Sequence, residues 1–412
     1  MYLSDHITYL KFNFMKTSGL FICLLITAQS IFLCGCSNKN DEIDEQVENL
    51  ESFKTHVTEF GVNIFKSASQ SFSDCNLVIS PISAQLTLSM AANVLNSSEI
   101  CKAFGYEDLN ALNIANKHAI SKLATPAIVS ENGDTFSLAT KISNAVWFGN
   151  NVNVKAKKIL NRYYEAKVNQ GNLNSPKERK AIESWLSEAV VDNEIRPTIP
   201  DTENVDIMIN SVLYFNKEWD SDYHFSESYK DNFLTLQGER MADFMFARIN
   251  ANYFTNEEAQ SIILGIPPYK MVCVMPTTQS LSKFINNFGA SNLIEIINES
   301  TERSIDLSFP LFELNTNISL IPLLKNIGLN LKSTADDTNG ALPNLNVDQI
   351  STIRVDQTGV AAGSVTSLWI VLGLAETNDI IKLTFNHPFI YFIIEPETQA
   401  ILMAGQYAGP EE

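Results

Sequence analysis

The stretch from Gln357 to Asn378 reads QTGVAAGSVTSLWIVLGLAETN and falls into two parts of different character. Residues 358–367 carry no charge and no side chain bulkier than valine, whereas residues 368–374 are strongly apolar. The first part can be a flexible linker, because it is rich in glycine, alanine and serine. Residues 360–374 can also be an ordinary buried strand or helix, which a short apolar run does not distinguish. A third interpretation is a loop that can become a strand.

The third interpretation rests on what a central strand requires of its side chains. A strand that enters the middle of a sheet presents alternate residues to opposite faces, both of which are covered. Each entering residue must tolerate burial, because an unpaired buried charge carries a large desolvation cost. All eight residues from 360 to 367 are small and uncharged. One face would carry Val360, Ala362, Ser364 and Thr366, and the other Ala361, Gly363, Val365 and Ser367. The pattern therefore favours a segment that is able to insert into a sheet.

Segments elsewhere in the chain make that interpretation specific, because they resemble the serpin family. The segments are 76–94 (NLVISPISAQLTLSMAANV), 182–200 (IESWLSEAVVDNEIRPTIP), 209–219 (INSVLYFNKEW), 385–394 (FNHPFIYFII) and 398–410 (TQAILMAGQYAGP). The resemblance covers about residues 45–410. It implies an α+β fold with a large, mostly antiparallel central sheet, two further sheets, about eight to nine helices and a mobile reactive-centre loop.

The same resemblance implies that a protease attacks the loop and that cleavage releases its first part to insert into the large sheet. The hinge of that movement would be Gly359, Val360, Ala361, Ala362, Gly363 and Ser364. Val360 stands where the family usually has threonine or serine, and Ala361 where it usually has glutamate. Neither change adds charge or bulk, and valine is a good strand former. Gly363 is less favourable in a strand than alanine by roughly 0.5–1 kcal/mol. The hinge is therefore compatible with inhibition.

A polar cluster is expected beneath the opening of the large sheet. The resemblance places Ser80 and Ser83 there, at the start of the buried second helix, where Ser80 can cap the helix and Pro81 can occupy its first position. Gln349 stands where the family usually has histidine, and Ser211 where it usually has asparagine. Gln349 and Ser211 can still exchange hydrogen bonds with the two serines.

The bond that a protease would cut lies within residues 372–377. The usual spacing from Gly359 places it at Gly373, and the usual spacing from Pro388 places it at Thr377. The predicted reactive region is Leu372, Gly373, Leu374 and Ala375. There is no arginine or lysine between Arg354 and Lys382, which argues against a trypsin-like target. Leucine favours an elastase- or chymotrypsin-like serine protease, with a papain-like cysteine protease as another candidate. Alternatively, residues 369–374 pack on the domain and hide an aggregation-prone run.

The N-terminus resembles a bacterial lipoprotein signal. Lys11 and Lys16 precede an apolar run that ends in Leu-Cys-Gly-Cys at residues 33–36, a pattern typical of a secretory signal. We expect residues 1–36 to be this signal, Cys36 to be lipidated, residues 37–45 to be an acidic tether and residues 46–412 to be a single serpin domain. The protein would be exported and lipid-anchored in the cell envelope, at the outer membrane or cell surface. A plain signal or an uncleaved membrane helix are alternatives, and translation can also start at Met15.

Composition excludes some other functions. The formal net charge is −18, from 47 acidic and 29 basic residues, which argues against a nucleic-acid partner. Cys75, Cys101 and Cys273 would remain after signal removal, and we expect buried thiols with at most one pair. No spacing predicts a metal site or cofactor, and the motifs of several enzyme classes are absent. We therefore expect that the protein is not an enzyme. The resemblance implies a monomer whose partner is a target serine protease. The competing hypothesis, motivated by Val360 and the altered polar cluster, is a non-inhibitory serpin-fold binding protein.

Overall fold

The computed structural model describes residues 50–123, 128–129, 135–136, 140–150, 154–189, 205–329, 345–361 and 380–411. The chain divides into two compact units, Met1–Glu42 and Ile43–Glu412, and every described residue belongs to the second. The predicted signal and tether, with Cys36, lie outside the described residues. None of the described helices combines the length and the apolar character needed to cross a membrane.

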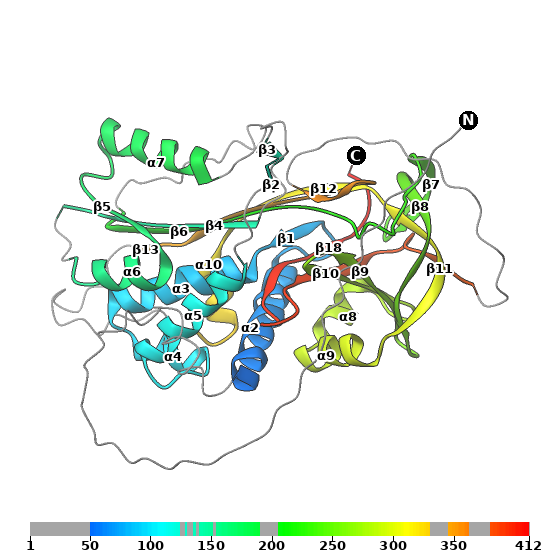
Figure 1. Cartoon of the computed structure of the whole chain (residues 1–412), viewed down its shortest axis with the longest axis horizontal. Helices are drawn as coiled ribbons and strands as arrows, with labels where there is room; N and C mark the ends of the chain where they lie inside the picture. The colour runs from blue at the N-terminus through cyan, green and yellow to red at the C-terminus, as the bar shows by residue number, and fades with distance from the viewer. Residues whose placement is uncertain are drawn as a thin grey trace, which may run out of the picture. The chain divides into compact units, whose positions relative to one another are not determined.

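The described ranges contain nine α-helices and three β-sheets, so the predicted α+β class is confirmed (Figure 1). The helices are α2 (Leu50–Ser71), α3 (Pro81–Leu95), α4 (Ser98–Ala103), α5 (Leu109–Leu123), α6 (Lys157–Tyr164), α7 (Pro176–Ala189), α8 (Leu281–Asn287), α9 (Ala290–Glu299) and α10 (Leu320–Asn326).

A seven-stranded, mostly antiparallel sheet holds the segments that sequence analysis connected with insertion. Its strand order is β12 (Phe312–Ser319), β14 (Asp348–Val355), β15 (Gly359–Ala361), β6 (Ile207–Glu218), β4 (Thr140–Phe148) and β5 (Lys167–Gln170), and β13 (Leu345–Asn346) also pairs with β6. Only the β4–β5 and β6–β13 pairs are parallel. Helix α7 lies on one face of this sheet, and α3 and α6 lie on the other (Figure 1).

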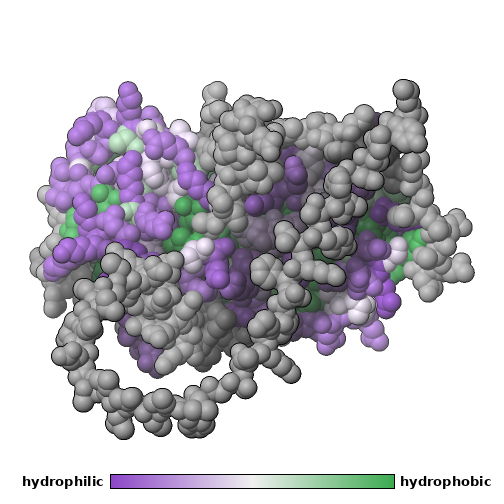
Figure 2. Space-filling model, in the orientation of Figure 1, coloured by the Kyte–Doolittle hydropathy of each residue, from purple (hydrophilic) through white to green (hydrophobic). Residues whose placement is uncertain are grey.

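Helix α7 is amphipathic, and this explains its position on the sheet. Its buried side chains Ile182, Trp185 and Leu186 pack on Trp147 of β4 and Met208 of β6. The two tryptophan rings meet edge to face with their centroids 6.4 Å apart. The opposite side of the helix faces solvent, and Figure 2 shows the surface around α7 as largely hydrophilic. The apolar residues at helical spacing in α7 therefore form the side that covers the sheet.

The other large sheet has nine strands and joins the two further sheets that the resemblance implied. Its order is β1 (Leu77–Ile79), β18 (Ile401–Tyr407), β17 (Phe389–Ile394), β10 (Tyr269–Pro276), β9 (Ala259–Ile266), β8 (Gly238–Thr255), β11 (Thr301–Pro310) and β16 (Ile381–Thr384), with β7 (Tyr229–Thr235) paired to β8. The connection is the 18-residue strand β8, which pairs with β7 along its first half and with β9 at its end. A two-stranded sheet of β2 (Ile128–Val129) and β3 (Thr135–Phe136) is separate.

Helix α3 begins as the sequence predicts. Ser80 is the N-cap in extended conformation, its hydroxyl accepts a hydrogen bond from the Ser83 backbone N–H, and Pro81 occupies the first helical position. All of its residues except Val94 are buried, because the helix lies between the two large sheets. A helix that is buried all round places its polar side chains where each needs a partner inside the protein.

The cysteine prediction is partly wrong. Cys101 and Cys273 are buried free thiols, and burial raises the pKa of both. Cys75 is also free but exposed. It lies in the turn between α2 and β1. Residue type by itself does not show whether a cysteine side chain in a turn is exposed. No pair forms among these three described cysteines.

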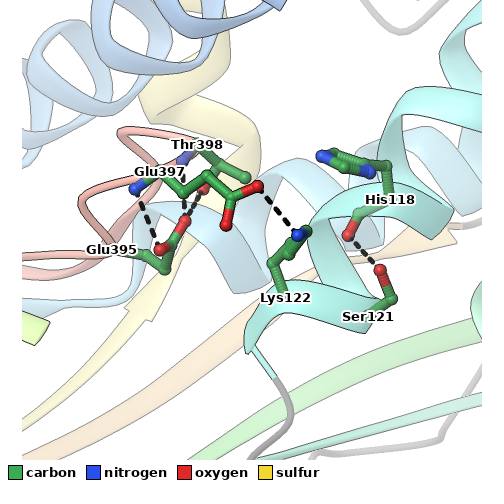
Figure 3. A network of polar contacts seen from close by, with 6 residues as sticks. All are labelled: His118, Ser121, Lys122, Glu395, Glu397 and Thr398. Atoms are coloured by element: carbon green, nitrogen blue, oxygen red, sulfur yellow. Dashed lines mark hydrogen bonds and ion pairs between the residues drawn. The ribbon is translucent and has the colours of Figure 1, made fainter. Parts of the chain in front are cut away.

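The turn between β17 and β18 is organised by a buried carboxylate (Figure 3). One oxygen of Glu395 accepts a hydrogen bond from the Glu397 N–H at 2.9 Å, and the other accepts the N–H and hydroxyl of Thr398 at 2.7 and 2.5 Å. Glu397 points the other way and forms an ion pair of 2.8 Å with Lys122 of α5. That pair is exposed, with side chains 38% and 55% accessible.

Replacing Glu395 with glutamine is expected to lower the free energy of unfolding by about 1.5–3 kcal/mol, because one acceptor becomes a donor that faces a buried donor. The matched control is Lys122→Gln, which removes the neighbouring exposed ion pair and should cost only about 0–1 kcal/mol. Guanidinium unfolding curves of both variants test the difference. Equal losses would show that the Glu395 contacts do not stabilise the turn as described.

Candidate functional site

The predicted hinge begins with a tight hairpin turn. Strand β14 ends at Val355, and the carboxylate of Asp356 then accepts the backbone N–H groups of Thr358 and Gly359 at 2.8 and 3.3 Å. The Asp356 N–H donates to the Gly359 carbonyl at 3.1 Å, which closes the turn. Arg354 lies 3.4 Å from the other carboxylate oxygen of Asp356. The hydrogen bonds of the Asp356 side chain therefore stabilise a turn that brings the chain back alongside β14.

The first three hinge residues already form a strand inside the seven-stranded sheet. On one side, Val360 and Ala361 pair with Val355 and Arg354 of β14. On the other side, Gly359, Val360 and Ala361 pair antiparallel with residues 218, 217 and 216 of β6. The remaining hinge residues Ala362, Gly363 and Ser364 lie outside the described residues. So do the reactive-region residues Leu372, Gly373, Leu374 and Ala375.

Val360 anchors this short strand. Its side chain has no exposed surface and belongs to the main hydrophobic cluster of the domain. Burying a valine is worth about 1.5–3 kcal/mol relative to exposing it. Lys217 lies opposite Val360 on β6, and burial lowers the pKa of its ammonium group. The departure from the family pattern at residue 360 therefore provides an apolar contact in the core.

Gly359 is held so closely against β6 that no side chain fits. A β-carbon at this position would collide with the carbonyl oxygen of Lys217 and lie 2.7 Å from the Cα of Glu218. Glycine is required at position 359 because there is no space for a side chain. Its backbone conformation does not require glycine, because it is not left-handed. The glycine at the start of the hinge thus permits β15 to lie in the sheet.

Replacing Gly359 with alanine is therefore expected to displace β15 from β6. Overpacking of this kind costs roughly 1–3 kcal/mol, so hydrogen-exchange protection of amides 359–361 should fall by about 5- to 150-fold. Gly289→Ala is the control, because its added carbon would find its nearest neighbour 3.7 Å away. Unchanged protection in Gly359→Ala would contradict the close contact.

Trp219 fixes the turn from the β6 side. Its indole Nε1 donates to the Asp356 carbonyl at 2.8 Å, and its backbone N–H donates to the Thr358 carbonyl at 3.1 Å. The indole is buried, with 5% of the residue exposed, and its ring lies 5.5 Å from that of Phe225. Neither Trp219 nor Asp356 is among the residues predicted to form the site. The pattern Asp-x-x-Gly after a strand is a turn signal that could have identified Asp356.

The predicted polar cluster comes together at three of its four residues. Gln349 accepts the Ser80 backbone N–H at 2.9 Å and donates to the Ser80 carbonyl at 2.8 Å. The Ser80 hydroxyl donates to the Ser83 hydroxyl at 3.0 Å. The Ser211 hydroxyl is buried and has no hydrogen-bond partner among the described residues. The Gln349 side chain therefore links β14 to the start of α3, because it hydrogen-bonds to the main chain of Ser80.

Gln349→Ala should destabilise the protein by about 1–3 kcal/mol, because it leaves the buried Ser80 N–H without a partner, while the Ser80 carbonyl keeps only the Ala84 N–H. Thr352→Ala on the same strand is the control, since Thr352 hydrogen-bonds at the exposed surface to Asn315. Thermal unfolding of the two variants measures the difference. If Thr352→Ala loses as much thermal stability as Gln349→Ala, the contact with Ser80 has no special role in stability.

Strands β6 and β14 are separated along the middle of the sheet. At one end β13 pairs with residues 207–208 of β6, and at the other β15 lies between the two strands. In the described part of the chain, no ladder pair joins residues 209–215 of β6 to β14. Residues 210–213 are only half-buried, and Ile350 on β14 is 42% exposed. Among the described residues, no strand therefore lies between β6 and β14 beyond Ala361.

The comparisons with known proteins agree with this architecture. The family model of serpins, described as serine protease inhibitors, matches residues 55–410. An uncharacterized serpin-like protein of Methanosarcina mazei is 27% identical over 304 residues, which cover 69% of this chain and 70% of that protein. Human serpin B4 is 25% identical over 401 residues, covering 88% of this chain and all of that protein.

Solved structures show the same fold at low identity. The thermophilic serpin tengpin in its native state has a TM-score of 0.73 and 23% identity, covering 87% of this chain and 95% of its own. Human thyroxine-binding globulin complexed with thyroxine has a TM-score of 0.74 and 17% identity, covering 88% of this chain and 100% of its own. The match of the family model to residues 55–410 decides the assignment, and this chain belongs to the serpin family.

Proposed function

We propose that the protein inhibits a serine protease as a suicide substrate. The observation that carries the proposal is strand β15, which lies between β14 and β6 with Val360 buried. No other described strand lies between β14 and the middle of β6. Because residues 359–361 already pair with β14 and β6, the strand can lengthen from them without a separate nucleation step. Family membership supports a serpin-type function in general, either protease inhibition or binding. Inhibition of a protease by this loop is our proposal.

The target that we propose is a protease with an apolar primary pocket. The chain between Arg354 and Lys382 offers no basic residue, and Leu372 and Leu374 suit elastase- or chymotrypsin-like enzymes. The protease serine would attack the carbonyl of the reactive bond, form an acyl ester and release the new N-terminus of the C-terminal part. The freed chain would then extend β15, form ladder hydrogen bonds on both sides and bury its inward side chains. The uncleaved fold would be a kinetically held state.

The test uses the chain from Ser37, which contains all residues matched by the family model. It is mixed separately with an elastase and a chymotrypsin and then analysed by denaturing gels and mass spectrometry. A band at the summed mass that survives SDS, with a released C-terminal peptide that locates the bond, is the expected result. Clean cleavage with full protease activity would contradict inhibition of those two enzymes.

A non-inhibitory binding protein is distinguished by a second measurement. Thermal melting before and after loop cleavage reports whether the loop enters the sheet, because new ladder bonds and burial stabilise the cleaved form. A large rise in melting temperature supports insertion. If cleavage leaves both the protease active and the melting temperature unchanged, the binding function replaces the inhibitory one.

For location, we propose an exported protein that is lipid-anchored at Cys36 and monomeric. The support is the sequence Leu33-Cys34-Gly35-Cys36 after an apolar run, followed by an acidic segment. Incorporation of labelled fatty acid into the wild-type chain, and its loss in Cys36→Ser, is the expected result. Label that persists in Cys36→Ser would contradict this anchor.

A further inference from the structure

Residues 154–180 form a basic segment in a chain with a large negative net charge. The segment carries eight basic and two acidic residues, a net charge of +6, whereas the whole chain carries −18. All eight basic residues are exposed: Lys155, Lys157, Lys158, Arg162, Lys167, Lys177, Arg179 and Lys180. No ion pair with any residue that the structure describes is formed by Lys157, Lys158, Arg162, Lys167 or Lys180. Pairing within the domain therefore does not account for this concentration of positive charge.

The basic residues lie at one edge of the seven-stranded sheet. Strand β5 is the edge strand, because among the described strands it pairs only with β4. Asn161 of α6 donates to the Ala166 carbonyl at 2.8 Å and so holds α6 against the start of β5. A β-carbon on Gly171 would lie 2.7 Å from the carboxyl carbon of Glu178, so the start of α7 lies against the other end of β5. Figure 1 shows α6 and α7 on either side of β5, and Figure 2 shows this end of the domain as largely hydrophilic.

We use the name basic edge for six exposed residues of α6, β5 and the start of α7: Lys157, Lys158, Arg162, Lys167, Lys177 and Lys180. Each lysine or arginine that lies close to an anionic membrane strengthens binding roughly fivefold. Exposed charges are screened beyond about 8–10 Å at moderate salt, so such a surface experiences mainly the charges next to it. The basic edge can therefore attract anionic lipid headgroups although the whole chain has a net charge of −18.

The proposed lipid anchor would bring this surface to a membrane. Helix α2 begins at Leu50, so 13 residues separate it from Cys36. Even when fully extended, these residues span at most about 45 Å. A domain tethered so closely meets the membrane at a high effective concentration, so a weak surface contact is sufficient to orient it. The partner that the chain itself would supply is thus a lipid surface.

An exposed apolar side chain beside the charges also favours lipid over a soluble polyanion. Ile159 of α6 is 37% exposed, whereas Leu160 and Tyr164 are the residues that this helix buries. Arg162 and Tyr163 are its neighbours on the helix surface, because they follow it by three and four residues. A helix that lies on a membrane places basic side chains among the headgroups and apolar ones beneath them. A sulfated polysaccharide offers no apolar region to Ile159.

We propose that the basic edge is a docking surface for an anionic phospholipid membrane, with Ile159 entering the headgroup region. The contact would lay the sheet edge formed by α6, β5 and the start of α7 on the membrane that anchors the chain. This inference does not depend on protease inhibition. It adds to the proposed anchor a second contact that sets the orientation of the domain.

The test measures binding of the chain from Ser37, without lipid, to vesicles by co-sedimentation. The vesicles contain either phosphatidylcholine alone or an equal mixture of phosphatidylglycerol and phosphatidylcholine. We expect binding to the mixed vesicles only, with a steep fall between about 0.1 M and about 1 M salt, where the screening length shortens from about 10 to about 3 Å. Because this chain lacks Cys36, failure here is distinct from failure of the labelled fatty-acid experiment.

Matched triple variants separate the basic edge from net charge. The first combines Lys157→Gln, Lys158→Gln and Arg162→Gln, and should lower the vesicle partition coefficient by at least about tenfold. The control combines Lys102→Gln, Lys283→Gln and Lys325→Gln, which removes the same charge from exposed positions on α4, α8 and α10 and should retain binding. Melting temperatures verify that both variants are folded. Equal losses in the two variants, or no binding of the wild type to the mixed vesicles, would overturn the proposal.

Ile159→Gln and a soluble polyanion distinguish a membrane from other anionic partners. Ile159→Gln should lower vesicle binding a few-fold, because an apolar contact is lost, and leave binding to dextran sulfate unchanged. Unchanged vesicle binding in this variant would overturn the role of Ile159. Strong binding of the wild type to dextran sulfate without binding to vesicles would assign the basic edge to a soluble polyanion and overturn the membrane contact.

Discussion

Replacing Val360 with lysine is expected to convert the proposed inhibitor into a substrate. The Val360 side chain has no exposed surface, and its partner on β6 is Lys217, so the new ammonium would be buried opposite another cation. Unpaired buried charge costs several kcal/mol, and like charges directly opposite in a sheet add to that cost. This cost is expected to release β15 from the sheet of the uncleaved variant, so residue 360 would have to re-enter the sheet before the loop could follow. If re-entry adds about 3 kcal/mol to the barrier, insertion slows more than a hundredfold. The acyl-enzyme would then be hydrolysed before the loop enters the sheet.

The measurement is the number of inhibitor molecules consumed for each protease molecule inactivated, together with the yield of the SDS-stable complex. Val360→Thr is the control, because it restores the residue type usual in the family with almost the same volume. We expect the lysine variant to give almost entirely cleaved chain and the threonine variant to behave like wild type. Equal complex yields from both variants would show that burial of residue 360 in the sheet is not needed for inhibition.

Replacing Trp219 with alanine is expected to produce the largest loss of stability among the substitutions considered. Truncating a buried tryptophan typically costs 3–5 kcal/mol. The indole also donates to the Asp356 carbonyl, so the turn that returns the chain into β15 loses its support from β6. We expect a fall of about 3–5 kcal/mol in the free energy of unfolding, with faster hydrogen exchange at amides 358–361.

Trp219→Phe separates packing from hydrogen bonding. Phenylalanine retains most of the contact with Phe225 but cannot donate to Asp356, so a loss nearer 1–2 kcal/mol is expected. Guanidinium unfolding gives the overall loss, and hydrogen exchange locates it. If Trp219→Ala loses stability without any change in exchange at 358–361, the indole supports the core and not the hinge turn.

Local sequence was sufficient for several features of this site. Alternation of small, uncharged residues from Val360 onward predicted a strand, and Gly359 to Ala361 form one. Ser80 and Pro81 predicted the start of α3, because capping depends on residues close in sequence. The five motif segments identified the family, and with it the α+β fold. These features rest on periodicity, propensity or contiguous residues, which a sequence displays directly.

Tertiary structure decided the contacts between distant residues. Trp219 and Asp356 are 137 residues apart, and Ser80 and Gln349 are 269 apart, so only the pairing of strands brings them together. The same pairing left Ser211 outside the polar cluster and Ser351 without a partner. The position of residues 359–361 in the sheet depends on space as well as pairing, since only a residue without a β-carbon fits against Lys217 and Glu218 at position 359. Alternation of small, uncharged residues predicts a strand from Val360 onward, and pairing with β6 explains why residues 359–361 form one in this structure.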